Sequence, residues 1–276
     1  MIEPHSHATV PPDRSPLVGR RIVVTGASSG IGRATAIRLA RSGAALLLHA
    51  RQNVQGLAET LLQVRDLSST AVDHASLLAD LSTEEGCERL VADAFAAGPI
   101  DAWVHLAGAD VLTGAIRSAG FDAKLDLLWR TDVLGTMRTC RAVGRRLAEQ
   151  PDSDERPAIV TVGWDQVAHG MAGDAGEMFG AIKGAVTAFS LSLARTLAPR
   201  VRVAVVAPGW IRTSWGEQAD PYWDRRAREE SLAARWGTPE DVAGAIAWLV
   251  GPDARFVTGQ VIAVNGGFRH AYDPAG

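Results

Sequence analysis

The sequence predicts an α/β protein that folds as a single domain, with a doubly wound, mainly seven-stranded parallel sheet covered by helices on both faces. From residue 20 onward, short apolar runs alternate with longer stretches of helical periodicity, which is typical of parallel strands joined by helical crossovers. The chain has 276 residues, of which 47% are hydrophobic and 21% charged, so it is long enough to bury one large core. Right-handed crossovers in such a sheet place ligands beyond the carboxyl ends of the strands.

Seven short apolar runs are predicted to be strands, because unbroken apolar character is typical of strands that are buried on both faces. In chain order they span residues 20–25, 45–49, 76–79, 100–105, 158–162, 201–206 and 260–264. Helical patterns lie between them, and the clearest of these span residues 30–42, 121–148 and 177–197.

Residues 208–238 lack clear periodicity and are predicted to form a substrate loop. A loop of this length inside a compact domain is usually a lid or a binding loop. It carries four tryptophans, Trp210, Trp215, Trp223 and Trp236. Two interpretations remain open: the indoles bind a large, flat or apolar ligand, or they pack the loop onto the body of the protein or onto a neighbouring subunit.

The composition argues against several classes of function. Lys and Arg number 28 against 31 Asp and Glu, so no basic stripe for nucleic acid and no polybasic membrane anchor is predicted. No apolar run approaches the roughly 18 residues of a membrane span. Cys87 and Cys140 are too few for a disulfide framework, which indicates thiols in a reducing cytoplasm.

The first 16 residues are predicted to be a disordered leader to a domain that spans residues 17–276. They contain four prolines and no apolar segment of the kind found in signal peptides. His5 and His7 in this leader are potential metal ligands, but nothing nearby completes a site, so solvated tail histidines are the favoured interpretation. No metal is therefore predicted.

The strongest local motif is TGASSGIG at residues 25–32, which follows the first predicted strand and opens the first predicted helix. Glycines permit the tight turn and let the backbone approach a pyrophosphate, which the N–H groups at the helix N-terminus then bind. A strand before the motif and a helix after it are the context that makes it specific. The motif predicts a dinucleotide-binding Rossmann fold, with contacts from Gly26, Ser28, Ser29, Gly30, Ile31 and Gly32.

With this motif the chain resembles the short-chain dehydrogenase/reductase family, whose further landmarks follow in order over residues 20–267. HLAG at 105–108 stands where the family has NNAG, Lys183 takes the place of the lysine of YxxxK, and APGWIRT at 207–213 matches PGxIxT. RWGTPED at 235–241 and the run at 258–267 match its C-terminal part. The resemblance implies a nicotinamide dinucleotide cofactor bound by Asp80, Leu81, Ala107, Gly108, Lys183, Pro208, Gly209, Ile211 and Thr213.

The end of the second strand indicates which cofactor is used. An acidic residue there would hydrogen-bond the ribose hydroxyls of NAD, but the sequence is His49-Ala50-Arg51, with no carboxylate. Because Arg51 is suited to pair with a 2′-phosphate, NADP(H) is predicted in preference to NAD(H). The alternative is a solvated arginine that stacks on adenine without selecting either cofactor.

The resemblance also implies a catalytic set of tyrosine, lysine, serine and asparagine, of which only the lysine, Lys183, is present. Phe179 takes the place of the tyrosine, and Gly163 or Trp164 stands where the serine is expected. Asp132 takes the place of the asparagine. Since hydride transfer to a carbonyl develops an alkoxide that must be stabilised and protonated, the chain needs another proton donor or a substrate that requires none.

Asp165, which follows the fifth strand at the carboxyl edge of the sheet, is the first candidate for a replacement acid or base. A loop or helix-capping aspartate is the alternative. His169, Glu177 and Tyr222 are weaker candidates in the same segment and in the substrate loop. His105 is expected to be a satisfied, partly buried histidine.

Three functions remain open from the sequence. The first is an NADP(H)-dependent oxidoreductase that acts on a bulky, aromatic or polycyclic small molecule through a non-standard proton donor, or on an iminium or polarised C=C that needs none. The second is a non-redox dehydratase, isomerase or cyclase on the same fold, and the third is an inactive cofactor-binding module. The resemblance implies a homodimer or homotetramer assembled through the helices at 121–148 and 177–197.

Overall fold

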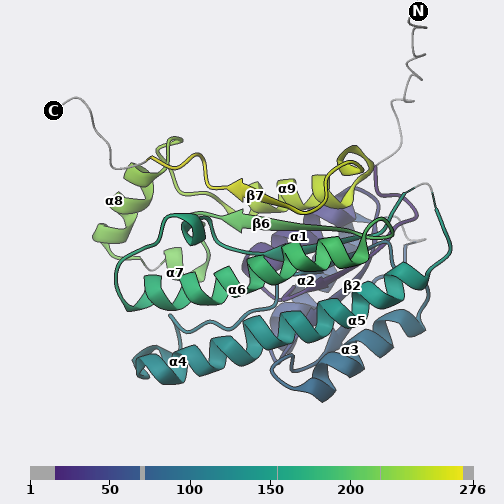
Figure 1. The fold of residues 1–276 in the computed structure, drawn as a ribbon, viewed down its shortest axis with the longest axis horizontal. Coiled ribbons are helices and arrows are strands. Elements are labelled where there is room, and N and C mark those ends of the chain that lie inside the picture. Colours follow the sequence, from purple (N-terminus) through teal and green to yellow (C-terminus); the bar gives the residue numbers. More distant parts are fainter. Residues whose placement is uncertain (1–15, 69–71, 154, 218, 270–276) are drawn as a thin grey trace, which may run out of the picture.

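The computed structural model describes residues 16–68, 72–153, 155–217 and 219–269. Within them, seven parallel strands form one sheet, as predicted, and their order is β3-β2-β1-β4-β5-β6-β7 (Figure 1). The strands are β1 Arg21–Thr25, β2 Ala45–Ala50, β3 Ala75–Leu78, β4 Ala102–His105, β5 Ala158–Val162, β6 Arg202–Pro208 and β7 Gln260–Val264. The order reverses between β1 and β4, and ligands of doubly wound sheets bind at this switch point.

Helices cover both faces of the sheet. They are α1 Gly30–Arg41, α2 Val54–Leu67, α3 Glu84–Ala96, α4 Phe121–Leu128, α5 Gly135–Glu149, α6 Asp174–Leu197, α7 Ser214–Glu217, α8 Pro221–Glu230 and α9 Pro239–Val250. Side chains of α1, α2 and α9 pack in one apolar cluster, and those of α3, α5 and α6 pack in another on the opposite face. Figure 1 shows α5 and α6 running side by side in front of the sheet, with α1 and α2 behind it.

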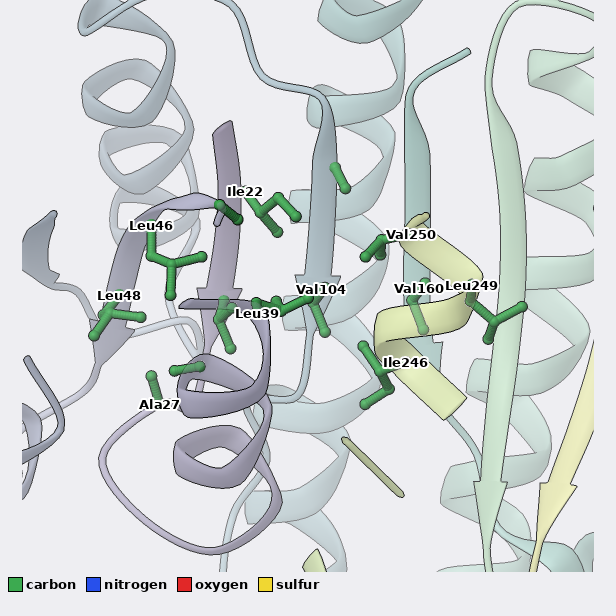
Figure 2. Close-up of a cluster of buried hydrophobic side chains, with 14 of the residues drawn as sticks. Ile22, Ala27, Leu39, Leu46, Leu48, Val104, Val160, Ile246, Leu249 and Val250 are labelled. Atoms are coloured by element: carbon green, nitrogen blue, oxygen red, sulfur yellow. The ribbon is translucent and has the colours of Figure 1, made fainter. Parts of the chain in front are cut away.

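The first cluster is built from strand residues of one face and from the inner faces of α1 and α9. Leu46, Ile22 and Val104 project from three neighbouring strands toward Leu39 of α1, and Ile246 of α9 closes the cluster (Figure 2). All five side chains are at least 98% buried. Such continuous burial explains why the strands carry unbroken apolar runs.

The second cluster includes Trp103 and the two cysteines, Cys87 and Cys140, which are all buried. Burial raises the pKa of both thiols, because the thiolate form is disfavoured away from water. The cysteines therefore serve as packing residues, in agreement with the sequence, and offer no reactive thiolate.

Local capping explains where several helices begin. Asn53 and Thr83 accept hydrogen bonds from the backbone N–H groups of the first turns of α2 and α3. Thr238 and Asp241 form a capping box at the start of α9. These caps fix the loops that enter the helices at the carboxyl edge of the sheet.

Two predicted segments differ from the structure. The single helix expected at 121–148 is interrupted by a π-helical turn at Trp129–Leu134, which separates α4 from α5. The loop expected at 208–238 contains α7 and α8, since Asp220 caps α8 and Pro221 occupies its first turn. Figure 1 shows the arrowheads of β6 and β7 pointing toward these two helices.

Some predictions fall outside the described residues. These are the leader, apart from Pro16, and its histidines His5 and His7. Within the described residues, no helix is long and apolar enough to span a membrane. The same part of the chain brings together no cluster of three or more metal-ligating side chains.

Candidate active site

The turn after β1 brings the ends of β1 and β4 into close contact. Thr25 Oγ1 accepts hydrogen bonds from the N–H groups of Leu106 and Ala107, both at 3.0 Å. Gly26 has a φ of +69°, and a Cβ on it would lie 2.9 Å from the carbonyl oxygen of Leu106. Only glycine fits a position where the backbone is both left-handed and this crowded.

The N-terminus of α1 opens directly from this turn. Gly32 packs against it so closely that a Cβ would lie 2.0 Å from the carbonyl oxygen of Gly26. The first turn of α1 contains no acidic residue, and its N-cap, Ser29, makes no side-chain hydrogen bond to the helix. The free N–H groups and the positive end of the helix dipole are therefore available to an anion.

Two neighbouring cavities lie at the carboxyl edge of the sheet. The first, of about 600 Å³, extends from the α1 N-terminus to the end of β2; the second, of about 540 Å³, extends toward α7 and α8. They share lining residues, among them Ile31, Gly108 and Phe179, and so form one continuous space.

Fifteen of the sixteen residues that the sequence assigned to the cofactor line this space. Those in the first cavity are Gly26, Ser28, Ser29, Gly30, Ile31, Gly32, Arg51, Leu81, Ala107, Gly108 and Thr213. Those in the second that are not also in the first are Lys183, Pro208, Gly209 and Ile211. The exception is Asp80, whose carboxylate accepts hydrogen bonds from the N–H and hydroxyl of Ser82 before α3. Burial opposes ionisation of Asp80, but these bonds and the charge of Arg51 lower its pKa.

Two histidines beside Thr25 belong to the same edge of the sheet. His49 and His105 are both in register with Thr25 on the neighbouring strands. His49 lines the first cavity, although no sequence motif pointed to this residue. His105 is 98% buried rather than partly buried, and burial, reinforced by the nearby His49 and Lys183, lowers its pKa to about 3. Its neutral ring accepts a hydrogen bond from Trp103 Nε1 at 3.4 Å.

A buried ion pair lies in the second cavity. Lys183 Nζ donates to Asp132 Oδ2 at 2.9 Å, with the Lys183 side chain 16% exposed and that of Asp132 only 3%. The other Asp132 oxygen accepts from the N–H of Ala109 at 2.8 Å. Asp132 stands in the π-helical turn, and such turns occur frequently at functional sites. One carboxylate thus links the loop after β4 to α6.

Phe179 lines both cavities one helical turn before Lys183. Trp164 lies beside it in the second cavity, edge to face, with ring centroids 6.3 Å apart. Gly163 also lines this cavity, but a Cβ on it would meet Thr187 Oγ1 at 2.8 Å and Val205 Cγ1 at 3.0 Å. Of the two positions at which the serine was expected, 164 is therefore the one whose side chain borders the cavity.

The structure does not bring Asp165 into either cavity. Its Oδ2 accepts from the amide of Asn265 at 3.1 Å, beneath Gly209, and its Oδ1 is buried without a hydrogen-bond partner among the described residues. Burial raises its pKa, and the charge of Glu230 adds to this effect. Asp165 therefore joins the loop after β5 to the end of β7.

The weaker acid–base candidates also lie apart from the cavities. The ring of His169 stacks on Phe268, with centroids 4.9 Å apart. Glu177 is exposed on α6, and Tyr222 is 51% exposed on α8. None of the three is among the residues that line the two cavities.

The four tryptophans of the 208–238 segment form one cluster. Trp210 lies within 6.2 Å, centroid to centroid, of each of the other three indoles. Trp236 is buried, whereas Trp210, Trp215 and Trp223 line the second cavity. The indoles therefore pack against one another and also form a wall of the second cavity, and the binding of a ligand by them stays a prediction.

Carboxylates hold the indoles of this cluster in place. Glu230 accepts from Trp210 Nε1 at 2.7 Å, and Asp224 accepts from Trp236 Nε1 at 2.9 Å. The guanidinium of Arg226 lies over the rings of Trp210 and Trp223, 5.6 and 5.5 Å from their centroids. The wall is thus supported by hydrogen bonds and cation–π contacts of its own.

Residues 26–269 match the family described as Enoyl-(Acyl carrier protein) reductase. A cyclohexanol dehydrogenase from Rhodococcus sp. (strain TK6) is 33% identical over 94% of this chain and 99% of its own length. The structure of a putative short-chain alcohol dehydrogenase from Sinorhizobium meliloti superposes with a TM-score of 0.80 at 29% identity, covering 92% of this chain and 98% of that one. This chain belongs to the short-chain dehydrogenase/reductase family.

A further short-chain dehydrogenase, from Burkholderia cenocepacia, was crystallised in complex with NADP. It superposes with a TM-score of 0.77 at 26% identity, over 91% of this chain and 98% of that one. Members of the short-chain dehydrogenase/reductase family are oxidoreductases that use nicotinamide dinucleotides, and this chain shares their architecture over nearly its full length.

The buried ion pair of this short-chain dehydrogenase/reductase generates a stability prediction. Asp132→Ala leaves Lys183 and the N–H of Ala109 without their partner, which we expect to cost about 3–5 kcal/mol of unfolding free energy. Asp126→Ala removes the partner of Arg130 in an exposed pair on the preceding helix, and we expect it to cost less than about 1 kcal/mol. Urea unfolding of both variants measures the difference, and equal losses of unfolding free energy would show that the buried Asp132–Lys183 pair stabilises the protein no more than an exposed pair does.

His105 generates a pH prediction. Its pKa is about 3 in the folded protein against an ordinary value of 6.5, so the unfolded chain binds the extra proton. The contribution of the neutral His105 to the unfolding free energy is therefore fully present above about pH 6.5 and is lost as the pH falls toward 3. When the pH is lowered from 8 to 5, we expect the unfolding free energy of His105→Asn to fall by about 2 kcal/mol less than that of the parent protein. Urea unfolding at the two pH values tests this, and identical losses would refute it.

Proposed function

We propose that this chain is an NADP(H)-dependent oxidoreductase that acts on a bulky, aromatic or polycyclic small molecule, without the tyrosine and serine that the family uses. The observation that carries the proposal is the continuity of the two cavities. One end has the features of a dinucleotide site, and the other is walled by Trp164, Trp210, Trp215 and Trp223, with Lys183 within the same space.

The residues of the first cavity fit a dinucleotide. Gly26 and Gly32 leave the space that a Cβ would fill, and the open N-terminus of α1 offers N–H groups to a pyrophosphate. We assign Leu81 of this cavity to the adenine, and Lys183, which lines the adjoining second cavity, to the ribose hydroxyls. When bound, a reduced nicotinamide would supply a hydride.

A preference for NADP(H) is supported by Arg51. It is exposed at the cavity directly after β2, and residues 49–51 contain no carboxylate to repel a 2′-phosphate. The relative from Burkholderia cenocepacia that was solved with NADP is consistent with this preference.

The catalytic end departs from the family pattern at three positions. Phe179 has no proton to give, and Trp164 places an apolar ring where a serine hydroxyl would hold a substrate oxygen. Asp132 keeps the hydrogen bond to the loop after β4 and adds a charge that holds Lys183. The rings of Phe179 and Trp164 favour large, flat and apolar substrates, because aromatic side chains pack against flat ligands.

Lys183 is the proton donor that we propose for any substrate that needs one. Of the charged side chains that line the second cavity, it alone carries protons, and its ion pair with Asp132 holds the ammonium in place. Asp165, the first candidate from sequence, is less well supported because its carboxylate faces Asn265. The non-redox alternative, for which Asp165 was the first acid–base candidate, is less well supported for the same reason.

If Arg51 selects NADP(H), its removal should change the affinity of the protein for NADPH. Arg51→Ala should weaken NADPH binding by about tenfold or more and leave NADH binding nearly unchanged, because a charge-assisted contact to the 2′-phosphate is lost. Arg41→Ala, at an exposed arginine at the end of α1, is the matched control. Calorimetric titration measures both, and an equal loss for the two cofactors would refute the selection by Arg51.

The missing phenol predicts a gain of function. Phe179→Tyr places a hydroxyl in the cavity one turn from Lys183, and we expect NADPH oxidation with aromatic ketones to rise by about 10²–10⁴-fold. Phe189→Tyr introduces the same group on α6, in the second apolar cluster and away from both cavities, and should change nothing. A parent protein that reduces ketones as fast as Phe179→Tyr would show that position 179 is not the site of proton transfer.

A further inference from the structure

We infer that the preferred substrate is a bulky cation, namely a cyclic iminium ion or a protonated imine whose carbon–nitrogen double bond is reduced. This inference rests on the proposed reductase function and adds the chemical class of the substrate. It is carried by three features of the second cavity: its unbalanced negative charge, its aromatic wall and its lack of a phenol or serine beside Lys183.

The charges that line the second cavity sum to a negative value. The charged side chains among its lining residues are Asp110, Asp132 and Lys183, and the last two neutralise each other. Asp110 Oδ1 accepts from the N–H groups of Leu112 and Thr113, at 2.9 and 3.1 Å, which fix the carboxylate at the border of both cavities. Among the described residues, no cation pairs with Asp110. One carboxylate therefore remains to attract a positive charge.

The aromatic wall favours the same charge. Trp164, Phe179, Trp210, Trp215 and Trp223 all line the cavity. Two of these indoles already have the guanidinium of Arg226 over their rings, which shows that this cluster accepts cations at its faces. Aromatic faces attract ligand cations, and more strongly where water is displaced. A cationic ligand with a large flat skeleton satisfies the wall and Asp110 together.

The reduction of an iminium ion balances without a proton from the protein. The iminium carbon accepts a hydride from the reduced nicotinamide, so a C–H bond forms and the nicotinamide is oxidised. The π electrons of the C=N bond move onto nitrogen, which becomes a neutral amine. A protonated imine brings its own proton and ends as a secondary amine in the same way.

A carbonyl substrate would meet the opposite situation in this cavity. Its oxygen develops negative charge, which requires a hydrogen-bond donor and a proton. Thr213 carries the one side-chain hydroxyl among the residues that line the second cavity, the Lys183 ammonium is held by Asp132, and Asp110 would repel the developing alkoxide. With Phe179 and Trp164 in the cavity, a ketone would therefore depend on the paired Lys183 alone, whereas an iminium ion needs no donor.

Binding is measured first, because it does not depend on turnover. N-methyl dihydroisoquinolinium, a permanent iminium cation, is titrated by calorimetry into the protein, both free and loaded with tetrahydro-NADPH, which cannot transfer a hydride. The comparison ligand is the neutral hydrocarbon in which carbon replaces the charged nitrogen. We expect the cation to bind about tenfold more tightly or better. Equal or weaker binding of the cation would overturn the inference.

Variants test whether the preference comes from the named residues. Asp110→Asn keeps the shape and removes the charge, and should reduce the cation preference by about three- to tenfold. Asp253→Asn removes an exposed carboxylate that borders neither cavity and should leave the preference intact. An unchanged preference in Asp110→Asn would overturn the role of that carboxylate and the inference with it.

Turnover separates the inference from the proposed function. NADPH oxidation is followed with the iminium ion and with tetralone, a ketone on a similar bicyclic skeleton. Reduction of the iminium ion at least about a hundredfold faster than tetralone supports the inference, and comparable rates overturn it. If NADPH and the cation both bind but neither compound is reduced, the proposed reductase function fails, and iminium reduction fails with it.

Discussion

The buried ion pair between Asp132 and Lys183 is the interaction on which the geometry of the site depends. A carboxylate that is 97% buried is costly unless its oxygens are satisfied, and here one binds Lys183 while the other binds the N–H of Ala109. The π-helical turn that carries Asp132 is part of the same arrangement, since such a turn changes the direction of the side chains after α4. Three segments that are far apart in the chain thereby meet in the continuous space formed by the two cavities.

The sequence predicted the five central strands well because they are buried on both faces, and the more exposed edge strand β7, like β5, has the predicted ends. The glycine turn was also predictable, since its contacts are local and depend on residues that lack a Cβ. The π-helical turn was not, because one extra residue in a turn barely changes an apolar pattern over residues 121–148. Helix α8 was missed because Ala227 is its one buried residue. The pair Asp220-Pro221 is nevertheless a helix-start signal that was available in the sequence.

The end of β5 shows where pattern alone fails at the site. Trp164 and Asp165 are consecutive, and both stand at the carboxyl edge of the sheet, so either could be placed at the substrate from sequence. Consecutive side chains in extended backbone point in opposite directions, however, and Trp164 is extended. The indole borders the cavity and the carboxylate turns to Asn265. Choosing between the two residues requires the register of β5 against β6, which no local motif encodes.

The same interactions that make the tryptophan wall rigid also set its electrostatic character. Trp210 and Trp236 each donate the indole N–H to a carboxylate, and a guanidinium lies over each ring, that of Arg226 over Trp210 and that of Arg212 over Trp236. The faces of such rings attract positive charge and repel negative charge. A wall of this kind also displaces water from a bound ligand, while Asp110 is exposed at the border of both cavities. In the proposed reductase, Phe179 and Trp164 offer no hydroxyl to a developing alkoxide, whereas their rings favour a cation. On that proposal both residues act in the same direction as Asp110, and one charged substrate would account for all three.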